Sequence, residues 1–190
     1  MRWNLPNALT WLRMLAIPLL VAVYLLPSDE ASMNTRNLVG TSIFVAAAVT
    51  DWFDGWLARR LGQTSAFGAF LDPVADKLLV CAALVLLLDL NRVDALVSVV
   101  IIGREIAISA LREWMAGMGA RTSVAVHSIG KLKTAAQLVA IPMLLYHQPL
   151  FGVVPIHDIG TWLIYVAALL TLWSMFYYLR QAWPHLRDSS

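Results

Sequence analysis

The sequence predicts an all-α integral membrane protein, a single bundle of six transmembrane helices with both termini in the cytoplasm. Of its 190 residues, 59% are hydrophobic and 14% are charged, and the mean hydropathy is +0.69. A soluble domain has roughly a quarter of its residues charged. Several apolar runs approach the roughly 20 residues that cross a bilayer as a helix. The composition excludes a disordered chain and a disulfide scaffold, and a net charge of +2 argues against a nucleic-acid partner.

The six predicted helices cover residues 8–26, 38–57, 70–90, 95–115, 124–146 and 159–179. At ~1.5 Å of rise per residue, each is long enough to cross ~30 Å of hydrocarbon. The first differs from a cleavable signal peptide, because it is longer than the apolar part of such a signal, contains Arg13 and Pro18, and lacks a small-residue cleavage site. We therefore expect it to be retained as a membrane helix.

The links between the predicted helices are short and contain helix-breaking residues. They are residues 27–30, 62–65, 91–92, 117–123 and 147–158. Short links place consecutive helices side by side and antiparallel, so the second and third helices are expected to be neighbours. The chain has no internal repeat, and residues 1–190 are predicted to form one domain.

Lysine and arginine residues are distributed unequally between the two ends of the predicted bundle. One end collects Arg2, Arg13, Arg59, Arg60, Arg112, Arg121, Lys131, Lys133, Arg180 and Arg187. The other end has only Arg36 and Arg92. Because positively charged loops stay in the cytoplasm, the first end is predicted to be cytoplasmic. The aromatic residues near it are expected to anchor the bundle at the membrane interface: Trp3, Trp11, Trp114, Tyr177, Tyr178 and Trp183.

Four aspartates interrupt the second and third apolar segments: Asp51, Asp54, Asp72 and Asp76. An ionised side chain at mid-membrane costs on the order of 2.5–3.5 kcal/mol, so these carboxylates are expected to face a cavity or one another. Asp51 and Asp54 share one helical face, and Asp72 and Asp76 share another. Counted from the link between the two helices, all four converge just below the cytoplasmic surface.

A cluster of four carboxylates needs neutralising charge, and hard divalent cations with oxygen ligands supply it. Two Mg²⁺ or Mn²⁺ ions would balance the four charges, and paired metals are a common device for displacement at phosphorus. The alternative is that the aspartates form scattered ion pairs with Arg59, Arg60 and Lys77. No metal is assigned to the four histidines, which lack the spacing of metal ligands: His127, His147, His157 and His185.

Small residues lie on the same faces as the aspartates. Gly55 and Ala58 follow Asp54 on one helix, and Gly68 precedes Asp72 on the other. They leave room either for a bound nucleotide or for a close approach between helices.

These residues form the pattern D-x2-D-G-x2-A-R-x8-G-x3-D-x3-D, which runs from Asp51 to Asp76. The pattern resembles the signature of the CDP-alcohol phosphotransferases, membrane enzymes of phospholipid synthesis. Four other stretches resemble the bacterial phosphatidylglycerophosphate synthase branch of that family: residues 4–13, 103–106, 110–114 and 130–137. The likeness covers nearly the whole chain.

The resemblance implies transfer of the phosphatidyl group of CDP-diacylglycerol to sn-glycerol 3-phosphate. The products would be phosphatidylglycerol phosphate and CMP, made at the bacterial cytoplasmic membrane by a protein that is commonly a homodimer in the family. In the family the first three motif aspartates bind metal, here Asp51, Asp54 and Asp72. The fourth, here Asp76, also contacts metal and acts as the general base.

We predict that the nucleotide lies against the small residues of the motif and the arginine beside them: Gly55, Ala58, Arg59 and Gly68. Two metal ions would hold the diphosphate and stabilise CMP as the leaving group, while Asp76 takes the proton of the attacking glycerol hydroxyl. The acyl chains would stay in the bilayer.

The phosphate of glycerol 3-phosphate needs cationic donors, and arginine suits this role because its guanidinium binds phosphate with two N–H groups. Arg104 and Arg112 are eight positions apart on the fourth predicted helix and diverge by only ~80° around its axis. The alternative is that they pair with Glu105 and Glu113. Neighbours at i and i+1 do not face each other on a helix, which argues against that pairing.

Two lysines begin the fifth helix and diverge by ~200° around its axis. Lys131 shares a face with Thr134 and is predicted to bind the acceptor phosphate, whereas Lys133 is expected to extend to the membrane interface. Thr10 and Arg13, in the first helix, are expected to border the same cavity.

Other functions remain open from the sequence. An enzyme of the same family with serine, inositol phosphate or a lipid as acceptor would share the metal site and differ in the basic pocket. A cation-coupled transporter would use the aspartates as its ion site, but the chain lacks the repeats and paired broken helices typical of that class. A purely structural scaffold would have no need of four buried carboxylates.

Overall fold

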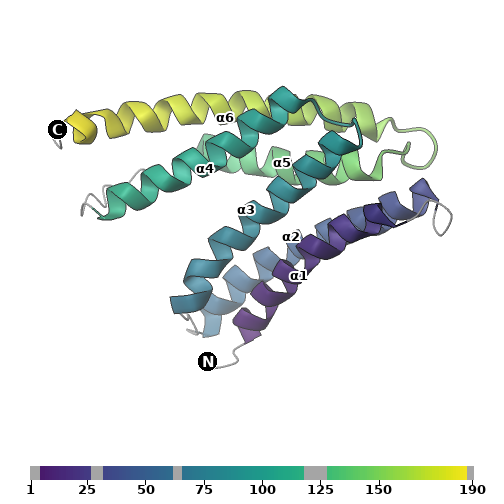
Figure 1. Cartoon of the computed structure of the whole chain (residues 1–190), viewed down its shortest axis with the longest axis horizontal. Helices are drawn as coiled ribbons and strands as arrows, with labels where there is room; N and C mark the ends of the chain where they lie inside the picture. The colour runs from purple at the N-terminus through teal and green to yellow at the C-terminus, as the bar shows by residue number, and fades with distance from the viewer. Residues whose placement is uncertain (1–4, 27–31, 62–65, 118–127, 188–190) are drawn as a thin grey trace.

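The computed structural model describes residues 5–26, 32–61, 66–117 and 128–187. Within these ranges, the following side chains are left undescribed: residues 5–8, 52–61, 66–70, 72, 73, 112, 116, 117, 128–131 and 181–187. The described chain is all-α, as predicted (Figure 1). It consists of α1 (Leu5–Leu25), α2 (Met33–Leu61), α3 (Ala66–Asp89), α4 (Ala95–Gly117), α5 (Ser128–Tyr146) and α6 (Ile156–Arg187).

The order and approximate extent of the six predicted helices are confirmed, and the differences lie at the helix ends. α2 begins at Met33 and α6 continues to Arg187, so both exceed their predicted apolar segments. α5 begins at Ser128, and residues 124–127 of its predicted span lie outside the described residues. The added residues are mostly polar, and for this reason the apolar pattern of the sequence did not include them.

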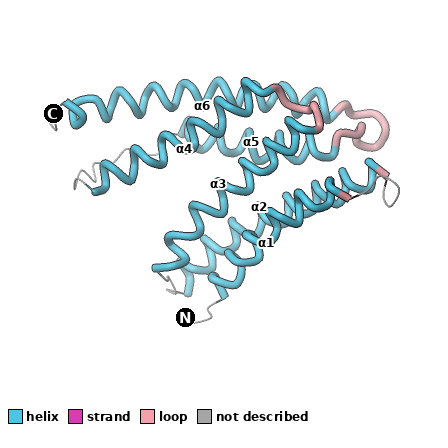
Figure 2. The backbone as a smooth tube through the Cα atoms, in the orientation of Figure 1, coloured by secondary structure: helices cyan, strands magenta, loops and turns pink. Residues whose placement is uncertain are grey.

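The helices alternate in direction, and the start of α1 and the end of α6 lie at the same end of the molecule (Figures 1 and 2). α5 packs along α6, and α4 also contacts α6. α1 packs against α2 and α3, and the predicted contact between α2 and α3 is present. In Figure 1, α1 to α3 and α4 to α6 diverge toward the end that holds the termini.

The apolar core fills the half of the bundle away from the termini. Its fully buried side chains come from all six helices: Leu20, Phe44, Leu84, Leu87, Ile101, Ile141, Leu144 and Ile164. The buried charged side chains of the opposite half are Arg13, Arg104 and Lys133. The end near the termini thus holds three of the buried cations, and the tightly packed end holds two more, Arg36 and Arg92.

Two glycines allow close contact between helices. A Cβ atom at Gly40 of α2 would lie 2.6 Å from Cε2 of Tyr24 on α1. A Cβ atom at Gly160 of α6 would lie 3.0 Å from the Cβ atom of Met143 on α5. At Gly40 the missing side chain makes room for the Tyr24 ring, and at Gly160 it lets α5 and α6 approach each other.

Arg92 connects the helices at the packed end. Asn91, with a φ of 56°, ends α3, and the N–H of Arg92 donates to the carbonyl of Leu87 at 2.8 Å. The Arg92 guanidinium is then directed inward. Its Nη1 donates to the carbonyl oxygens of Leu144 (3.2 Å) and Leu145 (2.7 Å), and its Nη2 donates to Asn37 Oδ1 at 2.8 Å. One buried side chain thus connects the α3–α4 link to α2 and to the end of α5.

The outer surface of the bundle is apolar. Trp162 is 74% exposed and Phe176 is 72% exposed, and many leucines and valines on the other helices are also exposed. Apolar residues outside and charged residues inside invert the usual arrangement of a water-soluble protein. Among the described residues, Ile156–Arg180 is the one stretch long and apolar enough by itself to cross a membrane. Leu9–Leu25 and Leu132–Tyr146 are shorter apolar helices.

Candidate active site

An ion pair connects α1 to the first motif aspartate. Arg13 Nη1 lies 2.5 Å from Asp51 Oδ1, and the Arg13 side chain is only 1% exposed whereas that of Asp51 is 45% exposed. Thr10 lies one helical turn before Arg13 and is also buried. The guanidinium therefore holds one oxygen of Asp51 from the protein interior, while the carboxylate as a whole stays accessible.

Asp76 of α3 lies within the electrostatic range of this pair. The charges that act on it come from Asp51, Arg13, Glu105 and Lys77. Carboxylates from α2 and α3 are therefore brought close enough to influence each other, at the end of the bundle near the termini. For these two of the four motif aspartates, the structure agrees with the convergence that the helical spacing predicts.

Eight other predicted site residues have side chains outside the part of the structure that is described. They are Asp54, Gly55, Ala58, Arg59, Gly68, Asp72, Arg112 and Lys131. The backbone of each lies in the predicted helix: four in α2, two in α3, and one each in α4 and α5. Their roles stay predictions. Among the described residues, no group of three or more His, Cys, Asp or Glu side chains lies close enough to hold a metal ion.

Arg104 of α4 is buried and contacts two other parts of the bundle. Its Nη2 donates to Ser174 Oγ of α6 at 3.0 Å, and its guanidinium carbon lies 5.6 Å from the centre of the Tyr178 ring. A guanidinium over an aromatic face is a favourable arrangement. Tyr178 is 7% exposed, so its prediction as an interface anchor is wrong: the ring packs against Arg104 instead.

Two further predictions about the charged cluster are wrong. Lys133 does not extend to the membrane interface, because its side chain is 3% exposed and its Nζ donates to Glu105 Oε1. The argument against a pairing of Arg104 with Glu105 is also wrong, because Arg104 Nη1 contacts the same oxygen at 3.2 Å. Neighbouring positions point apart on a helix, but these two long side chains of α4 bend toward each other at the oxygen that also contacts Lys133 of α5.

Sequence reasoning missed the pairing of Glu105 with Lys133 and the contacts that Ser174 and Tyr178 make with Arg104. A usable signal existed for Glu105, since an ionisable residue inside an apolar helix normally has a partner. Glu105 and Lys133 both interrupt apolar runs, yet which helices are neighbours decides whether they meet. Ser174 and Tyr178 carry no such signal, because serine and tyrosine are common in membrane helices.

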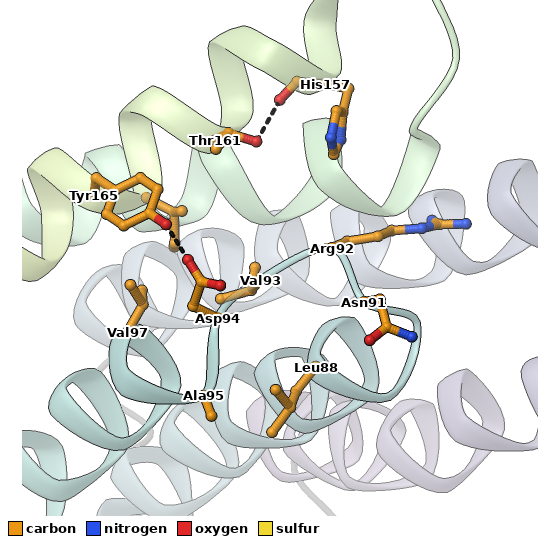
Figure 3. A pocket seen from close by; sticks show the side chains of 11 residues that line it. Leu88, Asn91, Arg92, Val93, Asp94, Ala95, Val97, His157, Thr161 and Tyr165 are labelled. Carbon is orange, nitrogen blue, oxygen red and sulfur yellow. Dashed lines mark hydrogen bonds between the residues drawn. The ribbon is translucent and has the colours of Figure 1, made fainter.

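A cavity of about 380 Å³ lies at the opposite, packed end (Figure 3). It is lined by residues of the α3–α4 link and of α6, among them Arg92, Asp94, His157 and Tyr165. The Tyr165 hydroxyl donates to Asp94 Oδ2. None of the predicted site residues lines this cavity, and its charged members are already paired with protein groups.

A family model described as CDP-alcohol phosphatidyltransferase matches residues 3–173. The chain belongs to this family. Enzymes of the family generally depend on a divalent metal ion, and an all-oxygen set that includes Asp51 and Asp76 is chemically suited to one.

Curated relatives of this CDP-alcohol phosphatidyltransferase match it over nearly its full length. The relatives from Salmonella choleraesuis, Shigella flexneri serotype 5b and Pseudomonas fluorescens are all named CDP-diacylglycerol–glycerol-3-phosphate 3-phosphatidyltransferase. The first is 50% identical over 190 residues, which cover 99% of this chain and 100% of the relative. The second is 48% identical with the same coverage. The third is 48% identical over 187 residues, 97% of this chain and 92% of the relative.

Proposed function

We propose that this chain transfers the phosphatidyl group of CDP-diacylglycerol to sn-glycerol 3-phosphate, forming phosphatidylglycerol phosphate and CMP. The observation that carries the proposal is the full-length match, at 50% identity, to a relative named for this reaction. The site supports it independently, because the described structure gathers carboxylates and buried cations at the same end of the bundle.

We infer that all six helices cross the bacterial cytoplasmic membrane and that the charged end faces the cytosol. The apolar outer surface and the uneven distribution of lysine and arginine support this orientation. An apolar groove of about 220 Å³ between α1 and α2 is lined by Leu12, Leu15, Leu19, Ile43 and Thr50, and it ends at Arg13. Such a groove suits an acyl chain of the donor lipid, since its polar end lies beside the Arg13–Asp51 pair.

The metal-binding residues in this proposal are Asp51, Asp54, Asp72 and Asp76. The exposure of Asp51 supports the fit: Arg13 contacts one of its oxygens at 2.5 Å, and the side chain is still 45% exposed, so its other oxygen is available as a ligand. Carboxylate oxygens suit Mg²⁺ or Mn²⁺, and two ions would balance four negative charges. A bound divalent ion would polarise the β-phosphate of the donor and stabilise CMP as it leaves.

Asp76 is the general base in this proposal. It accepts the proton of the glycerol 1-hydroxyl as that oxygen forms a bond to the β-phosphorus, and the bond between the β-phosphorus and the CMP oxygen breaks with its electron pair. The acceptor phosphate is held by Arg104, Arg112, Lys131 and Thr10. The nucleotide lies against the α2–α3 motif at Gly55, Ala58, Arg59 and Gly68. The expected homodimer stays a prediction.

The test measures CMP release by the purified protein with glycerol 3-phosphate, serine or inositol phosphate as acceptor. We expect turnover with glycerol 3-phosphate, and its loss in Asp72→Asn and Asp76→Asn. Asp158→Asn is the matched control, because Asp158 is an exposed aspartate in the first turn of α6. Preference for serine or inositol phosphate would make the acceptor assignment wrong, and full activity of Asp76→Asn would remove its role as base.

A further inference from the structure

Glu105 of α4 is a partly buried carboxylate to which the proposed reaction gives no task. Its Oε1 accepts from Lys133 Nζ of α5 and from Arg104 Nη1, which lies 3.2 Å away. Arg104 in turn donates to Ser174 of α6 at 3.0 Å. One carboxylate oxygen therefore connects two cations, and through them it connects three helices.

The pairing decides where the Lys133 ammonium lies. A lysine in an apolar helix has a flexible four-carbon stem and normally extends to the water interface. Lys133 instead is 3% exposed and points into the bundle. Removing a charged group from water is costly unless an opposite charge compensates it. Glu105 supplies that opposite charge, so it accounts for the inward position of Lys133.

Glu105 also lies in the same charged network as the proposed general base. Its charge acts on Asp76, and the charge of Lys77 acts on both carboxylates. The two cations that Glu105 holds therefore lie on the side of the bundle where the acceptor hydroxyl has to reach Asp76.

We propose that Glu105 is a positioning residue of the acceptor site, whose carboxylate holds Lys133 and Arg104 inward as a paired cradle for the phosphate of glycerol 3-phosphate. The inference rests on the proposed function and adds Lys133 to the residues that bind the acceptor. An ammonium carries three N–H donors and a guanidinium five, so each can contact a phosphate as well as a carboxylate. Glu105 itself contacts neither substrate.

The sign of one effect separates positioning from simple charge compensation. If Glu105 only cancelled positive charge, its replacement by glutamine would leave a more cationic site and strengthen phosphate binding. If Glu105 positions the cations, glutamine releases Lys133 toward the interface and weakens phosphate binding. The two roles therefore predict opposite changes in the KM for glycerol 3-phosphate.

The experiment compares steady-state CMP release by the wild-type protein, Glu105→Gln and the matched control Glu113→Gln, an exposed glutamate on the same helix. We expect the KM for glycerol 3-phosphate to rise about tenfold or more in Glu105→Gln, the range typical when a residue that orients a ligand-binding side chain is lost. The KM for CDP-diacylglycerol should stay within about twofold of wild type, since that substrate does not use the cradle. Glu113→Gln should behave as wild type.

Two further variants keep the inference testable. Glu105→Asp retains the negative charge on a side chain that is one methylene shorter, and it should give a KM between those of the wild type and Glu105→Gln. If Glu105→Gln is not recovered as a folded protein, the KM of Glu105→Asp tests the inference in its place. In a Lys133→Met background, Glu105→Gln should raise the KM by much less than it does alone, because it acts through Lys133. An unchanged or lowered KM in the Glu105 variants overturns the inference alone. Absence of glycerol-3-phosphate-dependent CMP release by the wild type overturns the proposed function, and the inference with it.

Discussion

Replacing Arg92 with methionine is expected to destabilise the packed end of the bundle while leaving the charged end intact. Methionine keeps much of the length and apolar volume of the arginine stem but removes the guanidinium. The change eliminates three hydrogen bonds, to Leu144, Leu145 and Asn37. The two carbonyls at the end of α5 then lose the donor that the structure gives them.

The size of the effect follows from these contacts. A hydrogen bond with a charged partner contributes roughly 1.5–3 kcal/mol, so three contribute roughly 4.5–9 kcal/mol before any offset. This loss of stability is partly offset, because the variant no longer buries a guanidinium away from water. We expect a net loss of about 3 kcal/mol in the free energy of unfolding, because the neutral acceptors that remain each cost about 1–3 kcal/mol when they are left buried without a donor. For a chain of this length, that lowers the Tm by about 6–12 °C.

The assay is thermal unfolding of the purified protein in detergent, with Arg180→Met as the control. Arg180 is an exposed arginine of α6, so its loss should change the Tm by about 1 °C or less. CMP release by Arg92→Met, measured well below its Tm, should stay within about twofold of wild type, because Arg92 lies outside the proposed catalytic machinery. A Tm of Arg92→Met equal to that of the control would refute the reasoning.

Three other outcomes are expected. Gly40→Ala places a Cβ atom 2.6 Å from the Tyr24 ring. It should lower the free energy of unfolding by about 1–3 kcal/mol, and the Tm with it. In the control Gly103→Ala the new Cβ atom meets no atom within 4 Å, so the Tm should stay unchanged or rise, since alanine favours helix over glycine by about 1 kcal/mol. Burial, and to a lesser extent neighbouring positive charge, lowers the pKa of His147 from 6.5. As the pH drops below about 6.5, the unfolded chain therefore takes up a proton before the folded protein does, and the Tm should fall. His147→Asn should flatten this part of the curve of Tm against pH. Removal of divalent ions by a chelator should abolish CMP release, and added Mg²⁺ or Mn²⁺ should restore it; activity that survives thorough chelation would contradict the proposed metal dependence.

The helices were predictable because length and apolar character alone indicate them. Their ends were not, since α2 starts at Met33 and includes Arg36 and Asn37, both of which are buried. A polar residue ends an apolar stretch in the sequence but does not end a helix. Arg92 was predicted to lie in a link, as it does, but its hydrogen bonds to α2 and α5 depend on the packing of distant segments.

The candidate site was predictable where the spacing along one helix decides the outcome. Asp51 and Asp76 each follow from helical periodicity within their own segment, and the structure brings them into electrostatic range of each other. The pairing of Glu105 with Lys133 depends on how α4 and α5 are rotated relative to each other. Periodicity within one helix says nothing about that rotation, which is why the inward position of Lys133 was missed.

The unequal filling of the bundle has a consequence for the cell. A bacterial membrane stores energy as a voltage, and each elementary charge that leaks through 100 mV dissipates about 2.3 kcal/mol. In the proposed orientation, the metal site occupies the cytosolic half. Close-packed leucine, isoleucine and phenylalanine side chains separate it from the other end, where the Arg92 guanidinium is held by protein groups. That layer acts as an electrical insulator, so phosphate chemistry can take place inside a coupling membrane without giving protons or cations a route across it.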